Sequence, residues 1–177
     1  PMKYLTLITL GFCILISSVS AKEVTGKTYR FTLPDEVRFE SNEQHEFYSF
    51  HWGGPTNSAL LMLHPNPAPI SLRALKPMAE MMQVTFEDQM KAQGQASEIE
   101  TKRSDLTLGD FQGVELEFTI KHDSGITIKQ WIWILHDGTH AWNGQLTAHS
   151  AEDIGIAHKI IEHATRIENT PENSNTK

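Results

Sequence analysis

The stretch ITIKQWIWIL, from Ile126 to Leu135, decides the fold that this sequence predicts. Trp131 and Trp133 alternate in it with isoleucines, so both faces of the predicted strand are apolar. An antiparallel sheet that is buried on one side only would make one of these faces polar. The tryptophan face therefore needs a cover, which is either a helix of the same chain or another molecule.

The preceding strand, VELEFTI from Val114 to Ile120, alternates regularly between apolar and polar residues. A three-residue loop at Asp123–Gly125 would join it to the tryptophan-bearing strand. That loop pairs Ile120 with Ile128, so the apolar side chains of the first strand and the isoleucines of the second share one face.

The next stretch, ILHDGTHAW from Ile134 to Trp142, is either a hairpin turn or a chemical site. His136, Asp137 and His140 are all residue types that bind metals. Local turn chemistry favours a two-residue loop, Asp137–Gly138, which would send the two histidines to opposite faces.

The pattern of the strand that follows this turn favours a loop with an odd number of residues. A three-residue loop, Asp137–Thr139, or an equivalent bulge, brings the apolar residues of that strand onto the face of Ile132. A shift by one residue would bury polar side chains there, at about 1–3 kcal/mol for each unpaired group. We therefore predict the odd loop. The apolar residues that it places on this face are Trp142, Gly144, Leu146 and Ala148.

The odd loop also puts His136 and His140 on one face, nearly opposite each other. Zinc normally needs three or four protein ligands, and the other histidines are scattered along the chain. We therefore predict a turn at this position, without a metal site and without a bound cofactor.

Two segments have helical periodicity. In ISLRALKPMAEMMQVTFEDQMKAQG, residues 70 to 94, we expect a helix that opens near Pro77 and ends at Gly94. A second helix is expected in SAEDIGIAHKIIEHATRI, residues 150 to 167, with Ser150 as its N-cap and Asp153 three residues later. Strands precede the first helix, and a three-stranded meander lies between the two. The predicted fold is α+β, an antiparallel sheet of about six or seven strands with helices packed on both faces.

Several segments resemble one known family. These are YRFTLP (29–34), the amphipathic first helix, LTLGDFQGVELEF (106–118) and IIEHATRI (160–167). In order and pattern they resemble the PsbP-like superfamily, which includes the DcrB-like bacterial envelope proteins, over roughly Thr28 to Glu168. The resemblance implies an antiparallel sheet between helices and a role as a binding or assembly subunit without catalysis. It implies no catalytic residues, because the family has none in common.

The N-terminus has the features of an exported protein. Lys3 precedes a twelve-residue apolar run, Leu5–Ile16, which is too short to span a bilayer. We expect a signal peptide at 2–21, cleaved after Ala21. The next residue is Lys22 and not a lipid-carrying cysteine, so we predict a periplasmic protein. The one cysteine, Cys13, would leave with the signal peptide.

The mature chain, residues 22–177, is predicted to be one domain, 22–168, followed by a polar disordered tail, 169–177. Without Lys3 it has 14 basic and 22 acidic residues, a net charge of −8. This charge, and the lack of a basic cluster with aromatics, argue against nucleic acid as a partner and against docking on anionic lipid. We also expect no stable insertion into the membrane.

Motifs for catalysis are weak in this chain. The mature part has no cysteine nucleophile, no Gly-x-Ser-x-Gly and no phosphate-binding glycine loop. Glu115 and Glu117 stand two apart on one strand face, where we expect a solvated surface. We therefore predict that the protein is not an enzyme.

The candidate partner surface consists of Trp131, Trp133 and Met81. Four of the five mature methionines lie on the first helix, and Met81 is the one that falls off its apolar line. We expect Trp131 to lie under a helix and Trp133, which is nearer the turn, to be more exposed. The alternative is that something other than this chain covers both tryptophans.

These features together favour a non-catalytic periplasmic module for protein binding or assembly. Its partner would be another envelope or secreted protein, and a specialised version is an immunity or chaperone protein for a secreted effector. The alternative from a different class is a metal-assisted hydrolase that uses the surface histidines His136 and His140.

Export gives the first testable prediction. The protein recovered from a periplasmic extract should begin at Lys22, and N-terminal sequencing measures this directly. A chain that begins at Met2, or that is recovered only with membranes, would contradict the prediction.

Overall fold

The computed structural model describes residues 21–42, 44–66, 70–94, 96 and 98–167. Within these ranges the chain forms mostly antiparallel sheets and two α-helices, so the predicted α+β class is confirmed. The predicted tail and all but the last residue of the predicted signal peptide lie outside the described residues. No helix in the described part is long and apolar enough to cross a membrane.

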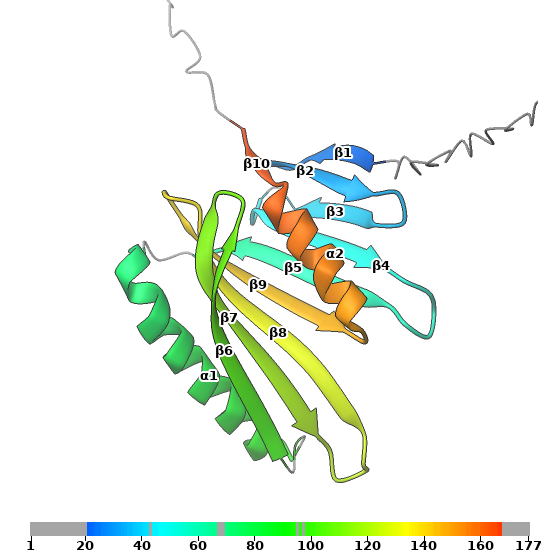
Figure 1. The fold of residues 1–177 in the computed structure, drawn as a ribbon, viewed down its shortest axis with the longest axis vertical. Coiled ribbons are helices and arrows are strands. Elements are labelled where there is room, and N and C mark those ends of the chain that lie inside the picture. The colour runs from blue at the N-terminus through cyan, green and yellow to red at the C-terminus, as the bar shows by residue number, and fades with distance from the viewer. Residues whose placement is uncertain (1–20, 43, 67–69, 95, 97, 168–177) are drawn as a thin grey trace, which may run out of the picture.

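The main sheet has seven antiparallel strands, which agrees with the predicted number (Figure 1). Its edge strand β6 was not identified from the sequence, because an edge strand needs no regular apolar alternation and β6 is largely charged and exposed. In spatial order the strands are β3 (Arg38–Asn42), β4 (Phe47–Trp52), β5 (Ala59–Pro65), β9 (Ala141–Ala148), β8 (Thr127–His136), β7 (Phe111–Lys121) and β6 (Glu98–Leu108).

A second, three-stranded sheet was not expected from the sequence. It consists of β1 (Ala21–Thr25), β2 (Tyr29–Pro34) and β10 (Thr165–Arg166), with β2 in the middle. The first and the last described segments of the chain thus lie side by side in this small sheet (Figure 1). The apolar residues of β2 alternate and are buried, so the small sheet packs one face against the aromatic core of the domain.

The predicted hairpin between β7 and β8 is confirmed. Ile120 pairs with Ile128, and the loop is Asp123–Gly125. The backbone N–H of His122 donates to the carbonyl of Ile126 over 2.9 Å, which closes the loop. Gly125 has φ +83°, a backbone conformation that glycine adopts without strain.

The predicted odd loop between β8 and β9 is wrong. His136 pairs with Ala141, so four residues, Asp137–His140, separate the paired strands, and the backbone N–H of Asp137 donates to the carbonyl of His140 over 3.1 Å; the count is even. This register places the apolar residues of β9 on the face of Trp131 and Trp133 and not on the face of Ile132. The residues concerned are Trp142, Gly144, Leu146 and Ala148.

The physical reason lies in what covers each face. The tryptophan face is the larger core, where side chains of β9, the small sheet and the second helix meet. On the other face, Asn143, Gln145 and Thr147 remain half-buried or exposed. The desolvation cost on which the prediction rested therefore falls mainly on Asn143, whose Oδ1 is buried without a hydrogen-bond partner.

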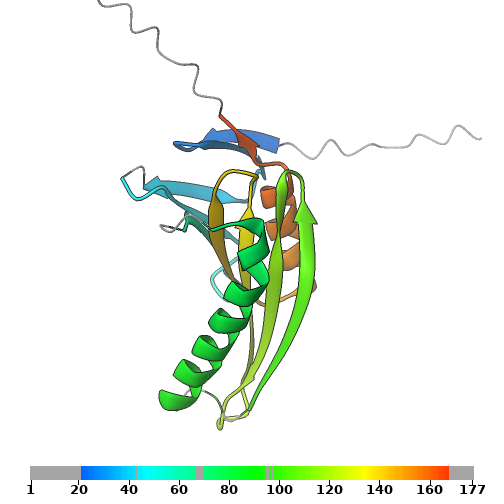
Figure 2. The same cartoon turned by 90° about the vertical axis from the view of Figure 1, so that its left-hand side faces the viewer.

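The first helix, α1 (Leu75–Ala92), follows a short 3₁₀ turn (Leu72–Ala74). Pro77 lies in its first turn, where a missing N–H is tolerated, and the helix ends before Gly94. α1 packs on β7 and β8, and its buried side chains cluster with Ile132 and Ile134. Figure 2 shows α1 following the long strands along their curve.

The second helix, α2 (Ala151–Glu162), begins as predicted. The Ser150 side chain accepts from the backbone N–H of Asp153, and Asp153 accepts from the backbone N–H of Ser150, which is a capping box. Its buried residues belong to the cluster that contains both tryptophans. α2 ends earlier than its apolar periodicity indicated, because Thr165 and Arg166 pair with β2 instead of extending the helix.

The burial of the tryptophans gives the second prediction. Trp131→Ala or Trp133→Ala should lower the free energy of unfolding by about 3–5 kcal/mol, because each opens a cavity in the core. Ile126→Ala, at an exposed position in the hairpin loop region, is the control and should stay within about ±0.5 kcal/mol. Urea denaturation measures all three. Equal stability of the tryptophan variants and the wild type would contradict the assignment of this face to the core.

Candidate functional site

The structure removes two of the three residues from the candidate partner surface. Trp131 is 2% exposed and Trp133 is 0% exposed. The expectation that Trp133 is the more exposed is wrong, because α2 lies against it: the indole ring is 5.7 Å from the ring of His158. Both tryptophans are therefore core residues, and Met81 alone remains accessible.

Glu115 is not on a solvated face, as the sequence had suggested. Its carboxylate accepts from the indole N–H of Trp133 over 2.7 Å and from His158 Nε2 over 2.9 Å. Burial raises the pKa of Glu115, but hydrogen bonds from His158, Trp133 and Ser104 outweigh it, and the pKa lies below its ordinary value. Glu117 is half-buried and forms an ion pair with Lys129. Glu115 of β7 thus holds the middle of α2 in place through its hydrogen bond with His158.

Asp137 has a similar fastening role at the β8–β9 turn. It accepts from the backbone N–H groups of Thr139 and His140 at 2.7 and 2.6 Å, and from the hydroxyl of Tyr29 in β2. Burial raises the pKa of Asp137, but these hydrogen bonds outweigh it and hold the pKa below its ordinary value. Burial and the same carboxylate raise the pKa of Tyr29. The turn therefore ties the small sheet to the main sheet.

The two histidines of this turn are not brought together as a site. His136 is buried, and its Nδ1 accepts from the backbone N–H of Gly138 over 2.9 Å. His140 lies in the four-residue loop and is exposed. In the described ranges, no group of three or more His, Cys, Asp or Glu side chains could hold a metal ion.

A third carboxylate, Asp153, holds the start of α2. It accepts from the indole N–H of Trp52 in β4 over 2.8 Å and from the backbone of Ser150 over 2.9 Å. Burial raises the pKa of Asp153, but hydrogen bonds from Ser150, His149 and Trp52 lower it below its ordinary value. Its carboxylate oxygens are thus engaged in structural bonds.

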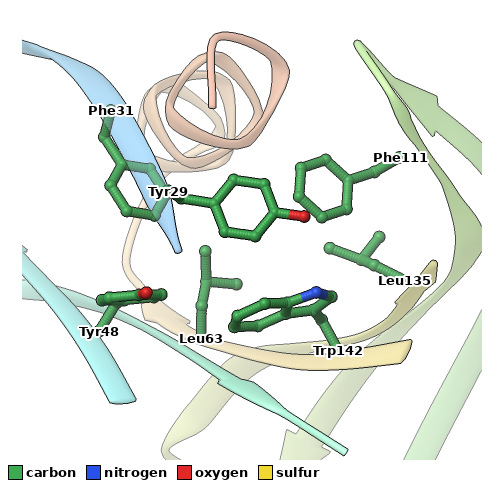
Figure 3. A pocket seen from close by; sticks show the side chains of 7 residues that line it. All are labelled: Tyr29, Phe31, Tyr48, Leu63, Phe111, Leu135 and Trp142. Carbon is green, nitrogen blue, oxygen red and sulfur yellow. The ribbon is translucent and has the colours of Figure 1, made fainter. Parts of the chain in front are cut away.

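The space between the two sheets contains a small aromatic cavity (Figure 3). Its volume is about 10 Å³, enough for roughly one water-sized sphere. All of its lining residues are buried, so it is a packing defect beneath the small sheet and is too small for a substrate. The lining residues are Tyr29, Phe31, Tyr48, Leu63, Phe111, Leu135 and Trp142.

An open apolar groove lies along α1, with a volume of about 280 Å³. We call it the α1 groove; it is lined by Met81, Met82, Thr85, Phe86, Gln89 and Ile132. Met81 is 63% exposed at its mouth, which agrees with its position off the apolar line. The predicted core-facing methionines of α1 are half-buried and pack against the cluster of Ile132 and Ile134.

The two flanks of α1 differ in charge. On the flank towards β6, Lys76 pairs with Asp105 at 2.8 Å and Glu80 with Arg103 at 2.9 Å. On the opposite flank, the groove-lining residues of α1 are all uncharged. The sequence does contain a signal for this uncharged flank. Met81, Thr85 and Gln89 lie four residues apart, so they share one face of the helix.

The sheet continues beyond the groove as an uncharged strip. Ile132 of β8 pairs with Gln145 of β9, Gln145 with Met62 of β5, and Met62 with Ser49 of β4. α1 packs on β7 and β8, whereas these residues lie on β9, β5 and β4. Beside the groove, this row of the sheet has no acidic or basic side chain until Glu40 of β3; Gln145 and Met62 are half-buried, and Ser49 is buried.

Comparison with known proteins bears on the fold alone. No family model and no curated protein matches the chain. A solved structure from Bacteroides thetaiotaomicron VPI-5482 is similar to it, with a TM-score of 0.50 and 12% sequence identity. The similarity covers 82% of this chain and 50% of that chain, so this chain spans about half the length of its structural neighbour. A likeness at this identity shows a shared fold and says nothing of activity.

The network around Glu115 gives the third prediction. At pH 7, Glu115→Gln should lower the free energy of unfolding by about 1–3 kcal/mol, because two charge-assisted hydrogen bonds are weakened. The folded pKa of Glu115 is depressed, so this contribution is complete above the unfolded pKa of about 4.3 and disappears as the pH falls through the lower folded value. Urea unfolding from pH 7 down to pH 3 should show the two proteins converging.

Asp88→Asn, at an exposed position on α1, is the control and should show no such convergence. A gap between wild type and Glu115→Gln that stays constant over the whole range would contradict the prediction.

Proposed function

We propose that this protein is a non-catalytic binding or assembly module of the bacterial envelope that holds an uncharged helical segment of another protein in the α1 groove. The observation that carries the proposal is the asymmetry of α1. One flank is fastened to β6 by ion pairs, and the other presents an exposed methionine above an open apolar groove.

The width of the strip beside α1 fits a helix. Adjacent strands lie about 4.8 Å apart, so β9, β5 and β4 span roughly 10–14 Å beside α1. An α-helix with its side chains is about 10–12 Å wide, and packed helices lie about 8–10 Å apart. One helix of a partner would thus fill the surface and lie beside α1.

The chemistry of the surface selects an uncharged face on that helix. A charge buried against the groove would lose its hydration and find no ionic partner among the residues that line it. Methionine side chains are flexible and polarisable, and they adapt to apolar surfaces of different shape. The expected ligand is therefore an amphipathic helix with apolar residues three or four positions apart, the helix-in-groove mode of recognition.

Two further features support this proposal. Side chains of α1 cluster with the isoleucines of β8 and side chains of α2 with its tryptophans, as expected if helices pack on both faces of the sheet. The order of strands, helix, strands and helix also agrees with the resemblance to the PsbP-like and DcrB-like proteins, which implies binding without catalysis. The proposed location is the periplasm, because the N-terminal sequence predicts a cleaved signal peptide. The proposed partner is another envelope or secreted protein.

The fourth prediction tests the groove. A photo-reactive amino acid at position 81 should cross-link in cells to a defined envelope or secreted protein, which mass spectrometry identifies. For the purified partner, Met81→Asp should weaken binding at least tenfold, because it places a charge in the apolar contact. Isothermal titration calorimetry measures the affinity, and the melting temperature should not change because Met81 is exposed.

Val84 provides a matched control. It is 58% exposed, apolar and on the same helix, but it does not line the groove. Val84→Asp should change the affinity by less than threefold, and a cross-linker at position 84 should give a weaker product. Equal effects at both positions would contradict the groove as the docking site.

A further inference from the structure

The methionines around the α1 groove differ in exposure. Met81 is 63% exposed, while the other four methionines of the mature chain are half-buried. From this difference we infer that Met81 is a reversible oxidation site that controls whether the α1 groove can hold its ligand. The regulatory part of this inference rests on the proposed function.

The chemistry requires a peroxide-class oxidant. A lone pair on the thioether sulfur forms the S–O bond as the O–O bond of the peroxide breaks, and the released hydroxide takes the proton from the new S–OH group, which leaves the sulfoxide and water. The sulfur loses two electrons and the peroxide gains them. Reductases of the methionine sulfoxide class reverse the change, with two thiols forming a disulfide and the oxygen leaving as water.

The fold directs the oxidant to one position. Met82 and Met90 pack against the cluster beneath α1, and the sulfur of Met78 contacts the side-chain amide of Asn66 at 3.9 Å. These three side chains are half-buried, so a peroxide reaches them less readily than it reaches Met81. Met81 should therefore react first.

Oxidation changes the groove from apolar to polar at its mouth. The sulfoxide oxygen is a strong acceptor, and in the free protein water can hydrate it. Thr85 and Gln89 lie four and eight residues further along α1 on the same uncharged flank, so water and these polar groups surround the position. Under an apolar helix the oxygen would lose that hydration, so the oxidised groove should bind its ligand at least tenfold more weakly.

Selectivity is the first part of the fifth prediction. The full protein is treated with hydrogen peroxide, and fragment-ion mass spectrometry resolves each methionine of α1. Met81 should oxidise at least about fivefold faster than Met78, Met82 and Met90, and in 8 M urea the four rates should converge because exposure becomes equal. Equal rates in the folded protein would overturn the inference.

The effect on the groove can be measured without the partner. Anilinonaphthalene sulfonate, a dye that fluoresces on apolar surfaces, is the probe. Peroxide should lower its binding several-fold in the wild type and leave Met81→Leu unchanged, since leucine stays apolar and does not oxidise. Met81→Gln, which is polar like the sulfoxide, should bind the dye weakly from the start. An equal loss in the wild type and Met81→Leu would overturn the assignment to Met81.

The two proposals fail in different ways. If Met81 oxidises selectively and the dye responds, but Met81→Asp does not weaken partner binding, the proposed function is wrong and the oxidation site remains. If oxidation is unselective, this inference is wrong whatever the cross-linking shows.

Discussion

The rest of the structure depends on one constraint, which is that β8 is apolar on both of its faces. A strand of this kind cannot face water on either side, so the chain has to supply cover twice. The isoleucines Ile132 and Ile134 of β8 cluster with side chains of α1, and its tryptophans cluster with side chains of α2 and the small sheet. The neighbouring strands follow β8: β7 adds its apolar side chains to the isoleucine face, and β9 adds its own to the tryptophan face.

The elements over the tryptophan face are fastened by carboxylates as well as by packing. Asp153 joins the start of α2 to β4, Glu115 joins its middle to β7, and Asp137 joins the small sheet to the β8–β9 turn. In each case hydrogen bonds outweigh burial and keep the pKa below its ordinary value, so the charged form is the one that the fold accommodates. Removing one donor would leave each carboxylate one hydrogen bond short at a site with little water, which can destabilise more than the bond itself contributes. These three residues therefore fix where the cover lies, while apolar burial supplies most of the stability.

The sequence predicts the elements whose structure depends on neighbouring residues. It does not predict a strand register or a burial that depends on an element far away in the chain. The β7–β8 register and the Ser150 cap follow from alternation and from a capping residue, and both are confirmed. The β8–β9 register depends on which face holds the larger core. The small sheet adds to that core, but its strand β10 comes from the opposite end of the chain to β2, so no local pattern predicts the sheet. The sequence predicts that Trp133 is more exposed than Trp131 because it is nearer the turn, yet α2 lies against it and it is fully buried. For the candidate site, Met81 could be predicted from the helical spacing, whereas the groove beside it needs the position of α1 over β8, which no local pattern specifies.

The pairing of β10 with β2 also constrains how the molecule forms. Thr165 bonds to a strand that was synthesised more than a hundred residues earlier, so the small sheet cannot close until almost the whole domain has emerged. Bringing together residues this far apart in sequence costs loop-closure entropy before the contact forms. Such contacts make folding slow compared with that of helical bundles. Until then the aromatic residues of β2 have no complete sheet to hold them over the core. A chain that ended before Thr165 would leave β2 paired with β1 alone.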